Sequence, residues 1–91
     1  RARYRVAFGA NIAVPTGGTV EAISVAIETN GEPVSSTIMT VTPAAVEEFF
    51  NVSRVTHIDV PAGCCLQISV GNISTQAIEV ENANLIVERV A

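Results

Sequence analysis

The chain has 91 residues, a net charge of −4 and five basic residues, all of them arginine. Nucleic-acid binding needs clustered positive charge to neutralise phosphates, so this composition disfavours it. No apolar run approaches the ~20 residues that span a bilayer, and we expect no membrane partner. Hydrophobic residues make up 48% of the chain and charged residues 15%, whereas small domains usually carry about 25–35% charged residues on their surface. We therefore expect surplus apolar surface to be hidden between copies of the chain.

The aliphatic residues are mostly β-branched, with 14 valines and 9 isoleucines against 2 leucines. Such side chains are stiff at χ1 and pack well on a pleated sheet, whereas leucine-rich chains favour helices. We predict an all-β fold, an antiparallel β-sandwich, in a single domain spanning residues 1–91. We also expect this domain to be part of a longer chain, because the sequence lacks an initiator methionine and begins within a strand pattern.

The first predicted strand begins near Tyr4, where apolar residues alternate with arginine and alanine. This period of two is typical of a half-buried strand. Gly9 and Asn11 interrupt the pattern and indicate a bulge or bend. The strand then continues to Val14 and ends before Pro15, because proline cannot donate to a ladder.

The stretch 19–29 predicts a second strand, with branched apolar residues on one face and small residues on the other. The small residues include Ala22 and Ala26, and we expect a second sheet or a neighbouring subunit to approach them closely. The Asn-Gly pair at 30–31 predicts a type I′ hairpin, which needs positive φ at both central residues. Residues 34–42 are expected to return as the partner strand.

Residues 42–48 combine a cap candidate with a following proline and predict a single helical turn at most, or a loop. Phe49 and Phe50 follow directly. They either supply bulk to the core or form an exposed aromatic contact for a sugar or a receptor. The stretch 55–70 then predicts a strand, a Pro-Ala-Gly corner and a second strand from Cys64 onward, which together form a buried hairpin.

Residues 76–81 predict a short strand, and the polar stretch 82–84 is expected to break it. The final strand, 85–90, carries apolar residues on both faces. Strands of this kind lie in the middle of sandwiches or at symmetric interfaces. We therefore predict that Leu85, Val87 and Val90 belong to an interface between subunits, together with the small residues of the second strand.

Cys64 and Cys65 are adjacent in the sequence. Side chains of neighbouring residues on a strand point to opposite faces, and a disulfide between them would be strained. We expect one of the two to lie in the core and the other to face the opposite side; a disulfide between two copies of the chain, or a metal site, is the alternative. With one histidine and no Cys-x-x-Cys motif, a zinc site is not predicted.

No arrangement of residues indicates catalysis. His57 and Asp59 share a face of their predicted strand, but no activated serine accompanies them, so we expect no enzymatic activity. Glu79, Glu81 and Glu88 offer carboxylates for calcium together with Asp59, yet no loop of the Asp-x-Asp-x-Asp type orders them. We interpret these carboxylates as a solvated face and predict neither a metal nor a cofactor.

Three segments resemble a known family: residues 23–34 with their Asn-Gly hairpin, residues 58–70, and residues 82–90, NANLIVERV. Together they resemble the tumour-necrosis-factor-like jelly roll, the trimeric globular head of complement-type proteins. The likeness is to the versions found in collagen-like proteins of bacterial spore surfaces and in small Firmicutes phage proteins. The resemblance implies a compact homotrimer with the closing strand near the threefold axis, and it implies no activity. A full jelly roll has about eight strands and we predict seven at most, so the family's amino-terminal strand is expected either to lie before Arg1 or to be degenerate at Tyr4.

The composition and the family resemblance together lead to two hypotheses for the function, from different classes. The first is a non-enzymatic structural module, a trimeric head or decoration domain on a phage virion or on a bacterial spore or cell surface, with other virion or surface proteins as further partners. The second is a receptor- or glycan-binding module of the same fold, such as a fibre tip or adhesin. That module would act through the loops at 30–33 or 42–50, and an exposed Phe49 and Phe50 would favour it.

Overall fold

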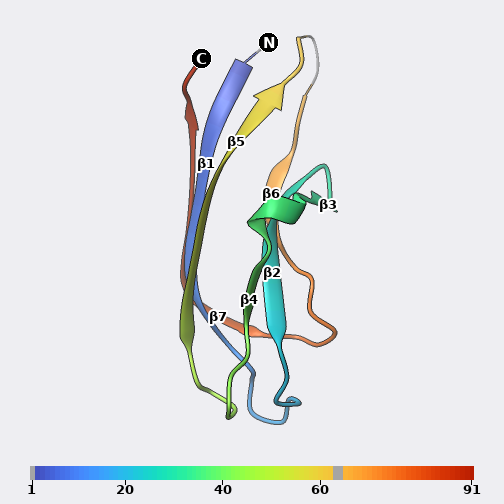
Figure 1. The fold of residues 1–91 in the computed structure, drawn as a ribbon, viewed down its shortest axis with the longest axis vertical. Helices are drawn as coiled ribbons and strands as arrows, with labels where there is room; N and C mark the ends of the chain where they lie inside the picture. Colours follow the sequence, from blue (N-terminus) through green and yellow to red (C-terminus); the bar gives the residue numbers. More distant parts are fainter. Residues whose placement is uncertain (1, 63–64) are drawn as a thin grey trace.

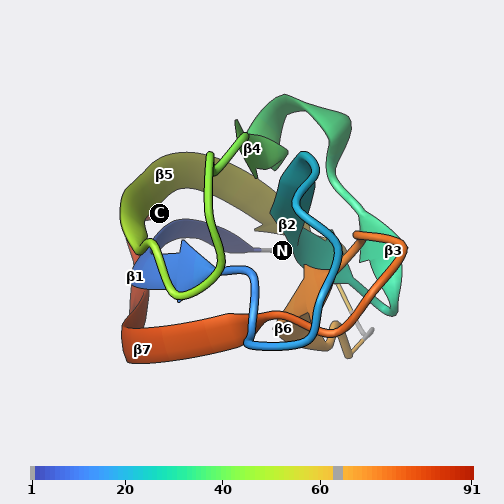
Figure 2. The ribbon, with the colours of Figure 1, turned by 90° about the horizontal axis from the view of Figure 1, so that it is seen from below.

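The structure, a computed structural model, describes residues 2–62 and 65–91. It consists of two antiparallel sheets that face each other across a shared core (Figure 1). Seen from below, one sheet lies on each side of the molecule (Figure 2). The prediction of an all-β antiparallel sandwich is confirmed, whereas the jelly-roll type stays a prediction. The described elements are β1 (Ala2–Ala13), β2 (Ile23–Thr29), β3 (Glu32–Pro33), the 3-10 turn η1 (Ser35–Thr37), β4 (Met39–Val41), β5 (Phe50–Val60), β6 (Ile68–Asn72) and β7 (Glu79–Arg89).

The first sheet has the order β5-β1-β7, with β1 in the centre. Alternate residues of β1, from Val6 to Ile12, are buried in the core, as the period of two predicts. The predicted irregularity is also confirmed, because the register between β1 and β7 shifts between Gly9 and Asn11. On the facing strand, Asn82 has a φ of 55°, which is where β7 takes up the extra residue.

The second sheet is organised around β2, which pairs with β3, β4 and β6. The predicted Asn-Gly turn is confirmed: Asn30 and Gly31 have φ values of 50° and 81°, and Thr29 pairs with Glu32. The predicted partner strand at 34–42 is interrupted by η1. The physical reason is Thr37, which is fully buried and whose hydroxyl takes the place of a strand partner for the main chain of Ile27.

The predicted hairpin at 55–70 is wrong. β5 does end at Val60, before Pro61, but it pairs with β1 in the first sheet. β6 begins only at Ile68 and pairs with β2 in the second sheet. The segment between them therefore crosses from one sheet to the other, and much of β5 is exposed. Gly63 and Cys64, on which part of the prediction rests, lie outside the described residues.

The predicted break at 82–84 is also wrong, because β7 continues through it as one strand of 11 residues. The positive φ of Asn82 absorbs the irregularity without ending the ladder. By contrast, the segment before Phe49 is a loop, as predicted. Val90 donates its amide to the carbonyl of Arg3 at 2.9 Å, so the two ends of the chain meet at one pole of a molecule 46 Å long (Figure 1).

Candidate subunit interface

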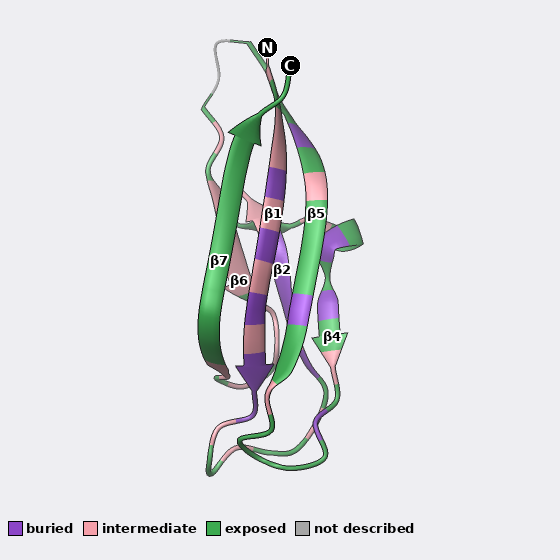
Figure 3. Cartoon of the chain, turned by 90° about the vertical axis from the view of Figure 1, so that its left-hand side faces the viewer, coloured by how far each residue is buried: buried purple, intermediate pink, exposed green. Residues whose placement is uncertain are grey.

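Strand β7 lies at the edge of the first sheet and is exposed along its length. Every residue from Val80 to the last residue of the strand is exposed, and Figure 3 shows β7 in the colour of exposed residues beside β1, on which buried and intermediate residues alternate. Leu85, Ile86, Val87 and Val90 each leave between 43% and 48% of their surface in contact with solvent. An exposed, long and apolar edge strand presents unpaired main-chain groups to any other chain. β7 is therefore the strongest candidate site for contact with another protein.

The inner face of β7 borders an open cleft between the two sheets. Leu85 and Val87 stand opposite Phe8 and Val6 of β1, so their side chains point toward the second sheet. Both are exposed, and among the described residues β7 makes no extensive contact with a strand of the second sheet. Two cavities of about 370 and 270 Å³ line this side of the sandwich. Their walls are formed by Tyr4, Val60, Cys65, Leu66, Ile68 and Val87, and by Phe8, Ile12, Val25, Val70, Ile78, Val80 and Ala83, with Gly71 and Asn72.

The outer face of the first sheet carries an apolar row. Ile86 of β7 and Val55 of β5 both stand opposite Ala7 of β1, from its two sides. Ile86 is 48% exposed and Val55 is 52% exposed. Because alanine is small, it leaves the two larger side chains standing above the sheet surface. Apolar surface on β7 thus extends to both faces, as the two-sided pattern of 85–90 predicted.

The charges on β7 are arranged asymmetrically along the strand. Glu79 and Glu81 lie at its amino-terminal end, and Arg89 lies at its carboxyl-terminal end. Glu88 sits 3.7 Å from Nη1 of Arg5 on the neighbouring strand. An exposed ion pair of this kind contributes at most about 1 kcal/mol to stability. The middle of the strand, from Leu85 to Val87, is uncharged and apolar.

The predicted interface residues fall into two groups. Leu85, Val87 and Val90 are exposed on β7, where a second chain can reach them. Ala26, in contrast, is fully buried within the protomer, so its expected place at a subunit interface is wrong. The small residues of β2 are covered by neighbouring parts of the same chain, and close approach there takes place inside the molecule. Ala22 is exposed, but it precedes β2.

The two phenylalanines do not form a joint exposed aromatic surface. Phe49 is half-buried. Phe50 begins β5, pairs with Ile12 and is 38% exposed. Each therefore contributes part of its ring to the fold, which is closer to the core interpretation than to the ligand-contact interpretation. The ligand contact stays a prediction for both Phe49 and Phe50.

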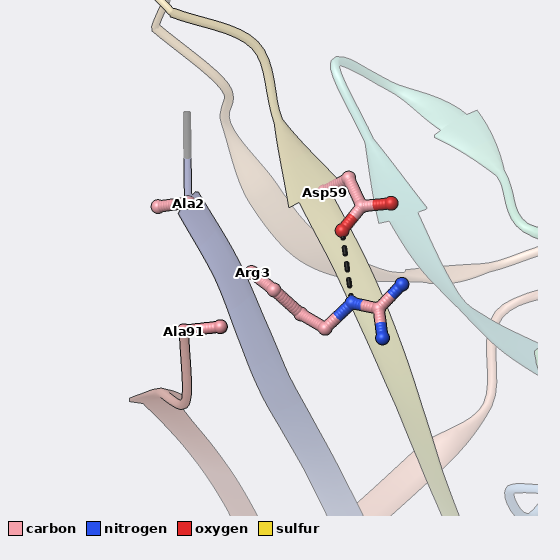
Figure 4. A pocket seen from close by; sticks show the side chains of 4 residues that line it. All are labelled: Ala2, Arg3, Asp59 and Ala91. Carbon is pink, nitrogen blue, oxygen red and sulfur yellow. Dashed lines mark hydrogen bonds and ion pairs between the residues drawn. The ribbon is translucent and has the colours of Figure 1, made fainter.

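A shallow pocket at the pole with the two chain ends contains an ion pair. Nε of Arg3 donates to Oδ1 of Asp59 at 3.0 Å, across the β1–β5 ladder (Figure 4). This hydrogen bond, and after it the negative charge of Asp59, raises the pKa of Arg3. Ala2 and Ala91 form the rest of the pocket wall. His57 is exposed on the same strand as Asp59, opposite Arg5.

The carboxylates considered for calcium do not converge. Asp59 is engaged by the arginine of this ion pair, and Glu88 lies beside Arg5. Glu79 lies at the other end of β7 from Glu88. Across residues 2–62 and 65–91, no three side chains of His, Cys, Asp or Glu gather closely enough to hold a metal ion.

Glu79 does form a pair with Glu47, a residue of the loop before β5. Glu47 has a φ of 59°, and its Oε2 accepts hydrogen bonds from the amide of Thr16 at 2.9 Å and from the Thr16 hydroxyl at 3.0 Å. Oε1 of Glu79 is shielded from solvent and accepts no hydrogen bond from a donor in the described residues. A proton on Glu79 resolves this arrangement, because the carboxyl group can then donate to Glu47.

The hydrogen bond between Glu79 and Glu47 shifts the pKa values of these two carboxyl groups in opposite directions. The hydrogen bond to Glu47 raises the pKa of Glu79 above its usual value of 4.5, with burial and the charges of Glu47 and Glu81 acting in the same direction. The same hydrogen bond lowers the pKa of Glu47 below 4.5, and the two bonds from Thr16 add to it. At a pH between the two pKa values the pair carries one proton, and Glu79 holds it.

Stability should depend on pH through this pair, with opposite signs for its members. The raised pKa of Glu79 means that the folded state loses stability as the pH rises above 4.5 and through that pKa. The lowered pKa of Glu47 means that stability is lost as the pH falls from 4.5 through the pKa that Glu47 has in the folded state.

Glu79→Gln keeps a neutral hydrogen-bond donor at every pH. We expect this variant to be more stable than the parent at pH 7 and to match it near pH 4.5, in urea unfolding between pH 4 and pH 8. Parallel pH profiles for the two proteins would contradict a proton held by Glu79.

The position of Cys65 differs from the strand prediction. Cys65 is exposed and precedes β6, and it borders the cleft beside β7. The chain is not in a strand at Cys65. The strand geometry from which opposite faces were expected for the two cysteines therefore does not apply to this residue. The other member of the pair, Cys64, lies outside the described residues.

Within the described part of the chain, no helix is long and apolar enough to cross a membrane.

Comparison of the chain with protein-family models, with curated proteins and with solved structures gave no match. The likeness to tumour-necrosis-factor-like heads therefore stays a prediction made from residues 23–34, 58–70 and 82–90.

Several residues of the candidate interface were not singled out from the sequence. Val80 and Ile86 are as exposed as the predicted residues, and they lie between Glu79 and Arg89, the charged residues at the two ends of the strand. Two signals pointed to these residues. One is the apolar character of both strand faces, and the other is a run that begins acidic and ends basic around an apolar centre. The cleft could not be predicted from the sequence, because its position depends on which sheet contains the strand that faces β7.

Proposed function

We propose that this chain is a non-enzymatic structural module that assembles with copies of itself. The single observation that supports this is β7, an edge strand whose aliphatic side chains, Leu85 and Val87 among them, are almost half exposed. Hiding the exposed half of such a side chain contributes on the order of 1 kcal/mol. A monomer forgoes this contribution at each of these positions and keeps an aggregation-prone edge in solvent. A second copy of the chain removes both disadvantages.

The setting we propose is a phage virion or the surface of a bacterial spore or cell, where the module serves as a head or decoration domain. The resemblance of residues 23–34, 58–70 and 82–90 to jelly-roll heads supports this setting, and it favours three copies. Other proteins of the same surface are further partners. The acidic net charge of −4 keeps such an assembly soluble.

The mass of the native particle tests this proposal. We expect light scattering at micromolar concentration to give a multiple of the 9.5 kDa protomer mass. The double variant Leu85→Arg with Val87→Arg should give single protomers, because it places charge on the surface that must be hidden. Val46→Arg is the matched control, since Val46 is 37% exposed in the loop before β5 and is not part of the apolar middle of β7. A parent protein that remains monomeric throughout this range would overturn the proposal.

One observation favours a glycan-binding module as the second candidate. The outer face of the first sheet has a depression of about 430 Å³ floored by Ala7 and Gly9. Side-chain amides surround it, and Asn51 Nδ2 donates to Oδ1 of Asn11 at 3.2 Å. Amides offer both donors and acceptors to sugar hydroxyls.

A glycan array with the parent protein and Asn51→Ala tests the glycan-binding function, and loss of a signal in the variant would support it. An array without signal for the parent would exclude it. The amide residues that line the depression are Asn11, Asn51, Asn82 and Asn84.

A further inference from the structure

The main chain of β7 has hydrogen-bonding groups directed away from its own sheet. The amide of Val90 donates to Arg3 on β1. Residues that exchange hydrogen bonds alternate along an antiparallel ladder with residues that do not. Between Leu85 and Arg89, the odd-numbered residues therefore direct their N–H and C=O groups outward from β1. Edge groups of this kind are a template for another strand.

The residues of β7 are complementary to a second β7 that runs in the opposite direction. Pairing about Ile86 places Leu85 of each copy opposite Val87 of the other, and Ile86 opposite Ile86. Asn84 then meets Glu88 of the second copy, where an amide can donate to the carboxylate. Arg89 then lies opposite Ala83, two residues from Glu81 of the second strand, whereas in-register parallel pairing would set Glu81 beside Glu81 and Arg89 beside Arg89.

We propose that β7 pairs antiparallel with β7 of a second copy, about a two-fold axis at Ile86. The inference rests on the proposed self-assembly and specifies its geometry. The three strands of each copy then form one sheet of six, in the order β5-β1-β7-β7-β1-β5. Leu85 and Val87 exchange main-chain hydrogen bonds with the second copy. Their side chains meet on the inner face, beside the cleft between the two sheets. This assembly has two copies, not the three that the family resemblance favours.

Such an assembly closes on itself. A two-fold contact uses the same strand on both copies, so each β7 edge is consumed by the other. The opposite edge of the sheet, β5, is tied to the second sheet, because Nη2 of Arg54 donates to the carbonyl of Ile38 at 3.0 Å. The apolar row of Val55, Ala7 and Ile86 continues across the axis into the same row of the second copy.

Cross-linking at the axis tests this geometry. Opposed residues in a non-hydrogen-bonded pair have Cβ atoms about 4.5–5.5 Å apart. In a background with both native cysteines changed to serine, we expect Ile86→Cys to form a covalent dimer under mild oxidation. Val55→Cys is the control, because it is equally exposed on the same sheet face but lies two strands from the axis. Light scattering of the unmodified protein is measured alongside.

A second variant tests the main-chain contact. Val87→Pro removes an N–H that faces the second copy and leaves the ladder to β1 intact, and edge strands tolerate proline. We expect the dimer dissociation constant to rise at least about tenfold, while Val87→Thr, which keeps the N–H, changes it much less. Cross-linking does not depend on the folding of the proline variant.

The possible results separate the two proposals. A particle of two copies with cross-linking at Ile86→Cys supports both. A trimer, or a dimer in which Ile86→Cys fails to cross-link, overturns the two-fold pairing and leaves the self-assembling module in place. A monomer at every concentration overturns both.

Discussion

Ile12→Ala is expected to lower the free energy of unfolding by about 2–5 kcal/mol. Ile12 is fully buried on the central strand β1, between Phe50 of β5 and Val80 of β7. Its truncation removes apolar contacts and enlarges the cavity of about 270 Å³ that it already borders. A domain of this size has a total stability of roughly 5–14 kcal/mol, so this one change removes a large part of it.

Urea unfolding at a fixed low protein concentration measures the effect of Ile12→Ala. The concentration is held constant because self-association would add to the apparent stability. Val55→Ala is the matched control, since Val55 lies in the same sheet but is 52% exposed. It should change the free energy of unfolding by less than about 0.5 kcal/mol. Equal losses for the two variants would show that the core does not lie between the two sheets as described.

Thr37→Val should lower the free energy of unfolding by about 2–3 kcal/mol although it preserves the shape of the side chain. The Thr37 hydroxyl is fully buried, accepts the amide of Ile27 at 3.0 Å and donates to the carbonyl of Val34 at 2.7 Å. Valine leaves both main-chain groups without this partner. The buried amide of Ile27 then carries the cost of desolvation without a hydrogen bond.

Thr37→Ser separates the hydroxyl from the methyl group. Serine keeps both hydrogen bonds and loses one methyl group, which costs about 1 kcal/mol. Chemical unfolding of the three proteins under identical conditions provides the comparison. If valine proves as stable as serine, the hydroxyl is not what holds η1 against β2.

The sequence was most informative where structure depends on near neighbours. The alternation along β1, the positive φ of Asn30 and Gly31, and the end of β5 before Pro61 are local properties, and each was predicted correctly. Backbone sterics and side-chain periodicity determine them without reference to the rest of the chain. The fold class follows from the same signals summed over the chain.

Pairing between distant strands was the part that could not be predicted. The stretch 55–70 has the pattern of a hairpin, but two strands around a corner also fit a crossover between sheets. The alternation of apolar residues shows which face of a strand is apolar, but it does not show which other strand pairs with it. β5 and β6 in fact belong to different sheets. The burial of Ala26 could not be predicted for the same reason, because it depends on which segments cover β2.

The candidate interface was predicted in part, through the two-sided apolar pattern of its strand. Leu85, Val87 and Val90 are exposed because β7 is at an edge. The same pattern also fits a strand in the middle of a sandwich, and only the topology distinguishes the two. Asn82 shows a further limit. The polar stretch 82–84 was expected to break the strand, whereas the positive φ of Asn82 accommodates a bulge within it.

The meeting of the two chain ends has a practical consequence. The amide of Arg3 donates to the carbonyl of Ala91 at 3.1 Å, so a fluorescent reporter or an affinity tag joined to either terminus would emerge from the same pole of the rod. The loop between β1 and β2, which contains Thr19, and the loop between β4 and β5 lie at the far pole (Figure 1). A protein immobilised by its terminus would stand upright with those loops outermost. Peptides grafted into them would be presented about 46 Å from the support.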